Sequence, residues 1–191
     1  MGQAEGKEDT ANVNTKSAIR TAGGGTLALA IAMLEDKHLD AQPHSDYPFG
    51  DRYPDGRPKT GDAANFGVYK MDWYMIQQCS AARPIIGDRP ASYVWQSAGA
   101  RINSDPKLAT HILLEAMRIW STEAPNPGSP KAGNFWAGHR WGETGLKNLP
   151  GTNWKDILRY YRSVQAIKAK CDADATVWTS IIRYWVEVPP V

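Results

Sequence analysis

The spacing of apolar residues along the chain predicts a mostly helical protein. Apolar residues recur every three or four positions over five stretches, and this is the period at which side chains share one face of an α-helix. The stretches are 14–22, 26–36, 63–81, 106–122 and 153–170. Thr26 and Asp62 favour helix starts because both residue types are frequent N-caps, and Pro106 does so because proline suits the first helical position.

The rest of the pattern predicts long connections around a helical core. Residues 175–186 fit a helix or a strand, and the spacing of their apolar residues favours a helix. Three polar segments separate the elements, and they are 40–61, 83–105 and 124–150. The second is expected to contain short strands around residues 93–96. Connections of this length are uncommon in a compact domain and are often functional, so we expect two of them to form the walls of a cleft.

Length and charge indicate one globular domain without a nucleic-acid partner. The chain has 191 residues and a formal net charge of +2, without a cluster of basic residues. Residues 1–13 are expected to be a flexible polar segment in the place of a signal peptide. Residues 14–191 are expected to form a single domain. The apolar stretch 26–34 is too short to span a membrane. Glu35 and Asp36 follow it directly instead of a cleavage site, so a helix of the mature protein is predicted.

The composition is rich in residues that suit sugar binding. There are eight Trp and eight Tyr against three Phe, and Trp and Tyr combine a flat apolar face with a polar group. About half of them are expected in the core on burial statistics. The two cysteines, Cys79 and Cys171, fit one disulfide or two buried thiols equally well, because two cysteines do not define a disulfide framework.

Glu35 is the first candidate for a catalytic group. It lies at the end of the apolar stretch 26–34, where a helix would meet a cleft. Partial desolvation of a carboxyl group disfavours its anion and raises its pKa, which is the property of a general acid near neutral pH. The alternative is a solvated glutamate in the last turn of a helix.

A second carboxyl group is available in the segment that follows. This segment is rich in acidic residues, namely Asp40, Asp46, Asp51, Asp55 and Asp62. Hydrolysis of a glycosidic bond generally uses two carboxyl groups, one to protonate the leaving oxygen and one to attack or to activate water. The alternative is an acidic loop that is simply solvated.

A metal site is not predicted. Asp51, Asp55, Gly56 and Asp62 fall at four positions of a calcium-binding loop, but Tyr53 occupies a ligand position and the last position lacks the usual glutamate. The four histidines do not have the spacing of metal ligands on one helix. The sequence therefore predicts no metal and no other cofactor.

The segment 135–146 combines aromatic, basic and glycine residues. Phe135 and Trp136 precede His139 and Arg140. One interpretation is a sugar-binding wall, in which the aromatic rings stack on sugars and the basic side chains donate hydrogen bonds. The other is a glycine-rich turn anchored by a buried tryptophan, and the residues alone do not decide between them.

Several blocks of the sequence resemble glycoside hydrolase family 134. The residues that carry the resemblance are Tyr-Pro-Phe-Gly-Asp at 47–51, the block 59–70 followed by Trp73, Phe-Trp-Ala-Gly-His-Arg-Trp-Gly at 135–142, and the apolar helix 23–35. Together these blocks run from about residue 18 to residue 161. The central block is long enough to be specific for the family.

This resemblance implies an activity and a fold. Members of the family are secreted endo-β-1,4-mannanases that act with inversion and without a metal. Their fold is α+β and mostly helical, similar to hen egg-white lysozyme, with a small β portion and long cleft-forming loops. The implied partners are β-1,4-mannan and mannooligosaccharides, with no nucleic acid and no membrane, and a monomer is the expected state.

The resemblance also assigns site residues. The family's general acid falls on Glu35 and its general base on Asp51. The positions expected near the substrate are Tyr47, Phe49, Lys59, Asp62, Asn65, Phe135, Trp136, His139 and Arg140. This chain departs from the family in having a longer connection after Glu35, Phe49 in place of tyrosine, and a longer segment 52–58. These departures affect the shape of the cleft and leave both carboxyl groups in place.

Three other interpretations stay open at this point. The nearest is a lysozyme-like hydrolase of peptidoglycan or chitin, which would use the same two carboxyl groups. A non-catalytic carbohydrate-binding module would need the aromatic residues but not the acid pair. A purely structural secreted protein would need neither.

Overall fold

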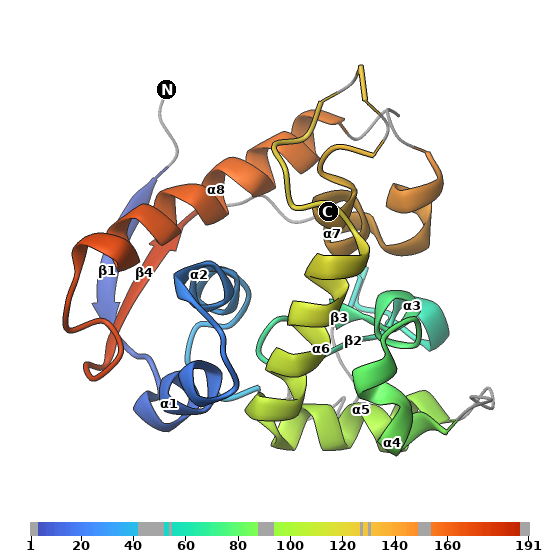
Figure 1. The fold of residues 1–191 in the computed structure, drawn as a ribbon, viewed down its shortest axis with the longest axis horizontal. Helices are drawn as coiled ribbons and strands as arrows, with labels where there is room; N and C mark the ends of the chain where they lie inside the picture. The colour runs from blue at the N-terminus through green and yellow to red at the C-terminus, as the bar shows by residue number, and fades with distance from the viewer. Residues whose placement is uncertain are drawn as a thin grey trace.

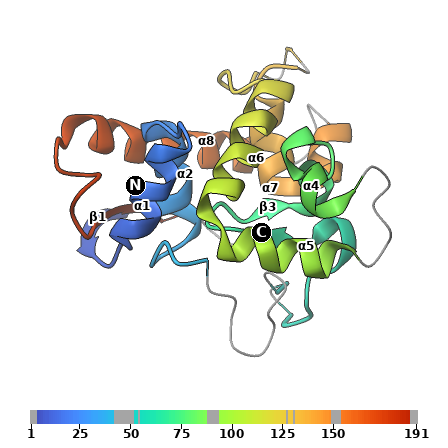
Figure 2. The ribbon, with the colours of Figure 1, turned by 60° about the horizontal axis from the view of Figure 1, so that its bottom comes forward.

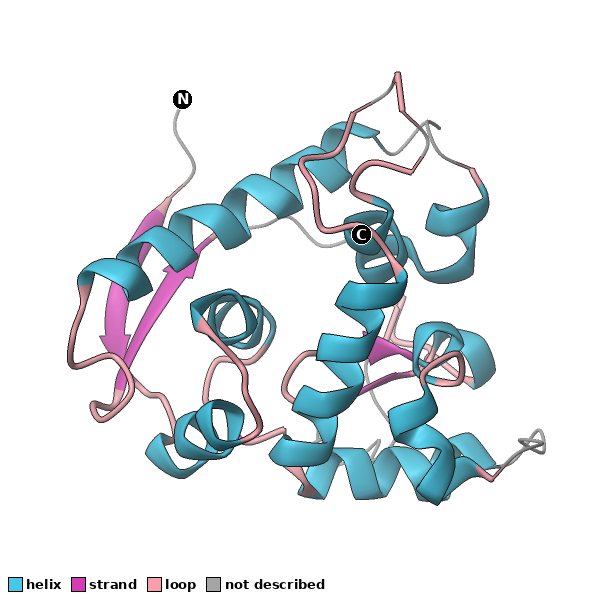
Figure 3. Cartoon of the chain, in the orientation of Figure 1, coloured by secondary structure: helices cyan, strands magenta, loops and turns pink. Residues whose placement is uncertain are grey.

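The computed structural model describes residues 4–41, 52–53, 55–87, 94–126, 128–129, 131–148 and 154–187. Within these residues the fold is α+β and mostly helical, with two small antiparallel sheets (Figure 3). The predicted fold class is confirmed to this extent. None of the described helices is long and apolar enough to cross a membrane.

Eight α-helices occur in the described residues: α1 (Val13–Thr21), α2 (Thr26–Glu35), α3 (Trp73–Ile76), α4 (Arg83–Ile86), α5 (Val94–Ser104), α6 (Pro106–Ile119), α7 (Asn134–Lys147) and α8 (Trp154–Ala173). One sheet pairs β1 (Glu5–Asp9) with β4 (Ile182–Val186), and the other pairs β2 (Asn65–Phe66) with β3 (Met71–Asp72). Two 3₁₀ turns cover Gly61–Ala63 and Ser80–Ala82. The predicted helices at the positions of α1, α2, α6 and α8 are confirmed.

Helix α2 is the centre of the fold. Its residues from Ala28 to Met33 are all buried, as expected for a helix that is apolar on every side. Helix α8 passes over it, and the β1–β4 sheet and α1 lie beside it (Figure 1). In the second view, helices α4 to α7 lie together on the other side of α2 (Figure 2). The N-cap of α2 is Gly25, whose backbone is extended, and not Thr26 as predicted; Thr26 is the first helical residue, and its hydroxyl donates to Asp172 of α8.

The β1–β4 sheet corrects two expectations. Residues 1–13 were expected to be a flexible end, but Glu5–Asp9 form β1, with Glu5 opposite Val186 and Asp9 opposite Ile182. The segment 175–186 was expected to be helical, but its second half is β4. The two strands lie at opposite ends of the sequence, so a local pattern cannot reveal that each provides the hydrogen-bond partner of the other.

Lys16 of α1 fixes the segment that leads into β4. Its side chain is fully buried, and its Nζ donates to the carbonyl oxygens of Val177 at 2.7 Å, Ser180 at 2.8 Å and Ile182 at 2.6 Å. An ammonium group has three donors, and all three are used here. Lys16 therefore joins the first helix to the last strand.

The predicted helix over 63–81 is wrong. This segment contains a 3₁₀ turn, the β2–β3 hairpin and the short helix α3. Gly67 has a φ of +72° in the hairpin turn, a conformation that glycine adopts without steric cost. The apolar residues with helical spacing, Phe66, Tyr69, Trp73 and Ile76, are nevertheless all buried.

Two segments expected to lack helices contain them. The short strands expected around 93–96 are replaced by α5, and the connection 124–150 contains α7. The glycines of α7 were interpreted as loop residues, but they permit close packing. A Cβ on Gly138 would lie 2.9 Å from the Met75 sulfur, and one on Gly145 would overlap the Ala137 carbonyl.

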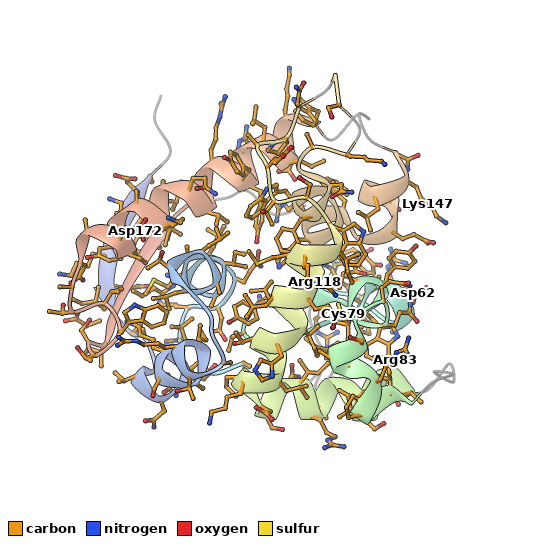
Figure 4. The ribbon with its side chains drawn as sticks, viewed as in Figure 1. Asp62, Cys79, Arg83, Arg118, Lys147 and Asp172 are labelled. Atoms are coloured by element: carbon orange, nitrogen blue, oxygen red, sulfur yellow. The ribbon has the colours of Figure 1, made fainter. Side chains whose placement is uncertain are left out.

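Both cysteines are free and buried, which decides between the two alternatives left open above. The Cys79 thiol donates to the Met75 carbonyl at 3.4 Å (Figure 4), and the Cys171 thiol contacts the Met33 sulfur. Burial raises the pKa of each thiol to about 12. Both are therefore protonated at neutral pH and unreactive as nucleophiles.

Candidate active site

Glu35 is the last residue of α2, and Asp36 ends the helix directly after it. Asp36 is extended, with φ −130° and ψ 115°, which ends the helix. Its carboxylate accepts hydrogen bonds from the next backbone N–H groups, those of His38, Leu39, Asp40 and Ala41, at 2.8–3.1 Å. These bonds fix the turn that follows Glu35, whose side chain is 18% exposed.

The Glu35 carboxylate lies where α2, α7 and α8 meet. Its Oε1 is 3.9 Å from Nδ1 of His139 on α7. The Tyr160 hydroxyl of α8 is 3.1 Å from the same Nδ1. The Tyr160 and His139 rings stack, with centroids 5.5 Å apart and an interplanar angle of 21°. Glu35 therefore faces solvent on one side and two buried polar rings on the other.

Both rings are neutral near pH 7. Burial lowers the pKa of His139, although the nearby Glu35 charge opposes this effect. Burial, followed by the Glu35 charge, raises the pKa of Tyr160 well above its ordinary value. Glu35 thus has two polar neighbours that bring no compensating positive charge.

Arg140, the next residue on α7, is paired with a carboxylate of α8. Its Nε lies 2.9 Å from Oδ2 of Asp156, and its guanidinium lies over the Tyr160 ring at 5.7 Å. The Trp141 indole N–H donates to the same Asp156 oxygen at 3.1 Å. Asp156 was not predicted as a site residue, and it holds α7 and α8 together beside Glu35.

The aromatic residues of the same segment lie behind the site. Phe135 and Trp136 are fully buried, so they offer no ring face to a ligand, and of the two interpretations of this segment the structure favours the buried tryptophan anchor over the stacking wall. The Trp136 indole donates to the carbonyls of Thr122 at 3.0 Å and Glu123 at 3.2 Å. The Phe135 ring packs against His139, with centroids 5.6 Å apart.

A second acidic group forms around Asp72. Asp72 is the N-cap of α3, and its Oδ1 accepts the Tyr74 N–H at 2.9 Å. Burial raises the pKa of Asp72 to about 7, the carboxylates of Asp62 and Glu143 add to the rise, and the Tyr74 N–H and Lys59 oppose it. The structure therefore places a carboxyl group here that titrates near neutral pH.

Helix α7 connects the two groups through Gly142. This residue has φ +54° and ψ −144° inside the helix, and a Cβ here would lie 2.5 Å from Oδ2 of Asp72. The kink thus brings α7 against Asp72, while His139, one turn earlier, contacts Glu35. The sequence signal for Asp72 was its place directly before the Trp73 helix start, because aspartate is a frequent N-cap.

Three of the predicted substrate-contacting residues gather near Asp72. Asn65 pairs with it across the β2–β3 hairpin, and its buried Oδ1 has no hydrogen-bond partner among the described residues. Asp62 is exposed in a 3₁₀ turn and accepts from Gln77 at 2.8 Å (Figure 4), so the N-cap role predicted for it belongs to Asp72. The Lys59 ammonium lies 5.7 Å from the centre of the Tyr53 ring.

The predicted residues Tyr47, Phe49 and Asp51 lie outside the described residues. Among those that are described, no group of three or more His, Cys, Asp or Glu side chains could hold a metal ion.

The sequence model of glycosyl hydrolase family 134 matches residues 13–188. The chain belongs to this family. The predicted family is confirmed, and the protein is a glycoside hydrolase with a polysaccharide substrate. No curated protein matches the chain. The candidate active site lies beside α7. This helix contacts Glu35 through His139 and Asp72 through Gly142.

Asp72 gives the hydrolase a testable pH dependence. Its folded pKa of about 7 exceeds the ordinary value of 3.8, so the folded state holds a proton that the unfolded state has released between these pH values. Stability therefore falls with rising pH across this window, by up to roughly 4 kcal/mol. Asp72→Asn keeps the cap oxygen without the charge, and its melting temperature at pH 9 should exceed that of the wild type.

The comparison is made by thermal unfolding from pH 3.5 to pH 9. The advantage of Asp72→Asn should disappear toward the acid end, where the wild-type carboxyl is protonated in both states. Asp105→Asn, the same change at the exposed N-cap of α6, is the matched control and should show no alkaline gain. A lower melting temperature for Asp72→Asn at pH 9 would mean that the ionised carboxylate is well solvated.

Proposed function

We propose that this hydrolase is a secreted, monomeric endo-β-1,4-mannanase with a lysozyme-like fold. Membership of family 134 supports the substrate, and the small β2–β3 hairpin beside a helical core supports the architecture. The observation that carries the proposal is the setting of Glu35. It is a partly exposed carboxyl group at the end of a buried helix, with two neutral polar rings behind it.

In the proposed mechanism Glu35 is the general acid and Asp51 the general base. Protonated Glu35 gives its proton to the glycosidic oxygen as the bond to the anomeric carbon breaks. Asp51 takes a proton from a water molecule that attacks this carbon from the opposite face, so the product has the inverted configuration. This geometry needs roughly 6.5–9.5 Å between the two carboxyl groups, to leave room for the water.

The remaining predicted residues divide into two roles. Lys59, Asp62 and Asn65 are proposed to contact the sugars. Tyr47, Phe49 and Arg140 are proposed to join them. The buried Phe135, Trp136 and His139 are proposed to act behind Glu35, because their burial leaves them little surface for a ligand.

The test is hydrolysis of mannohexaose followed by proton NMR of the new reducing ends. Short mannooligosaccharides that appear first in the α-configuration would support an inverting mannanase. First appearance of the β-anomer would contradict inversion and the proposed role of Asp51. If mannohexaose and mannan stay intact while chitin or a bacterial cell wall is cut, the proposed substrate is wrong and the lysozyme-like alternative holds.

A further inference from the structure

We propose that Trp185 of β4 stacks on a sugar ring of the polysaccharide, at a subsite that the β1–β4 sheet adds near the end of α2. This inference deepens the proposed function and rests on it for the identity of the sugar, a β-1,4-linked mannosyl unit. The residues proposed above to contact the sugars lie between residues 47 and 65 or on α7, so the sheet has no role in binding without this subsite.

The Trp185 ring lies against the backbone of Gly6, the residue opposite it in β1. A Cβ on Gly6 would lie 2.7–2.8 Å from three atoms of the indole, namely Cε2, Cζ2 and Nε1. This is closer than two non-bonded heavy atoms can pack without repulsion. The absence of a side chain at Gly6 therefore lets the ring rest on the strand, and the backbone of β1 supports it from one side.

The Trp185 side chain keeps a surface and a donor for a ligand. It is partly exposed, and it does not pack against the hydrophobic core as its neighbours Trp178 and Tyr184 do. Its indole N–H has no hydrogen-bond partner in the described part of the chain, whereas the Trp136 indole N–H donates to two carbonyls. A flat apolar face with an unused donor at its edge suits a sugar ring and its hydroxyl groups.

The sheet face that carries Trp185 is turned toward the last turn of α2. Alternate residues of a strand share a face, so Trp185 shares one with Arg183. The Arg183 Nε donates to the Met33 carbonyl at 2.7 Å, and Met33 lies two residues before Glu35. Trp185 follows Arg183 by two residues, roughly 7 Å along the strand. A polysaccharide bound at Glu35 can therefore reach the indole within a few sugar units.

An ion pair holds this face in place. Arg183 of β4 is paired with Glu8 of β1, so the same guanidinium joins both strands to α2. A surface that is ordered before binding loses less conformational entropy when a ligand arrives. Because the charges of Arg183 and Glu8 are already paired, the indole offers stacking area beside them to an uncharged sugar.

The test is the affinity for mannohexaose, measured by calorimetry in the Glu35→Gln background so that the sugar is not consumed. Adding Trp185→Ala should raise the dissociation constant about tenfold, because the stacking surface is lost. Trp185→Phe keeps an aromatic ring and should recover most of the affinity. Trp178→Phe, a change at a tryptophan that packs against the core, is the matched control and should leave the affinity unchanged.

The indole N–H provides a second measurement on the wild-type fold. In nitrogen-15 NMR the Trp185 indole signal, assigned by its absence from Trp185→Phe, should exchange rapidly with water in the free protein. It should move when mannohexaose is added. The Trp136 signal should exchange slowly and stay in place, since its N–H is bonded to the carbonyls of Thr122 and Glu123.

An unchanged affinity in Trp185→Ala, or a Trp185 signal that does not respond to the bound sugar, would overturn the inference and leave the proposed function intact. If the wild type cuts chitohexaose and not mannohexaose, the proposed substrate is wrong, and the same two measurements with chitohexaose decide the role of Trp185. A wild type that binds neither sugar would overturn both proposals. If Trp185→Ala does not fold, the NMR titration of the wild type remains decisive.

Discussion

Replacing Glu35 by glutamine should lower kcat on mannan by about 10³-fold, the middle of the range for loss of a general acid. Glutamine has nearly the shape of glutamate but carries no transferable proton, so the packing of α2 against α7 and α8 should persist. The measurement is the initial rate of reducing-end release, with a melting curve to show that the fold is intact. Glu123→Gln, the same change at an exposed glutamate after α6, should have the wild-type rate.

A second substrate separates the general acid from other roles of Glu35. A mannooligosaccharide with a dinitrophenyl leaving group needs no protonation, because the departing phenolate is already stable. Glu35→Gln should therefore recover most of its rate on this substrate, whereas Asp51→Asn should stay inactive on both, since water activation is still required. If Glu35→Gln retained a tenth of the wild-type rate on mannan, Glu35 would not be the acid. Asp72, with its pKa of about 7, would then be the principal alternative.

The helices that the sequence predicted correctly have a clear apolar pattern. In α6 and α8 apolar residues recur with the helical period over several turns, and α2 is apolar along almost its whole length. Glu35 could be placed at the end of α2 for this reason. The β2–β3 hairpin failed because each strand has two residues, and β1–β4 failed because its strands come from opposite ends of the chain.

Site residues that belong to a sequence motif could be predicted, and those whose role depends on tertiary contacts could not. The sequence identifies Glu35 and His139 as candidates. The distance between them depends on α7, a segment that was predicted to be a loop because of its glycines. Tyr160 and Asp156 lie on the predicted helix 153–170, and nothing in its pattern shows that they face α7. Asp72 was missed because its importance comes from burial beneath Gly142, a tertiary contact.

Lys16→Met should lower the free energy of unfolding by about 3–5 kcal/mol. Methionine matches the length of lysine but donates nothing. The carbonyls of Val177, Ser180 and Ile182 would then lose the ammonium that binds all three. Buried acceptors without a partner cost about 1–3 kcal/mol each, partly offset because no charge has to be desolvated. Burial already lowers the pKa of Lys16, which shows that this desolvation has a cost.

The measurement is denaturant unfolding, with limited proteolysis to locate the effect. Because Lys16 ties α1 to the segment before β4, cleavage in Lys16→Met should begin near residues 177–182, ahead of global unfolding. Lys107→Met, at an exposed lysine of α6, is the matched control and should change stability by less than about 0.5 kcal/mol. A loss below about 1 kcal/mol for Lys16→Met would mean that the desolvation cost of the ammonium nearly equals its three hydrogen bonds. Lys16 would then orient the β1–β4 sheet more than it stabilises it.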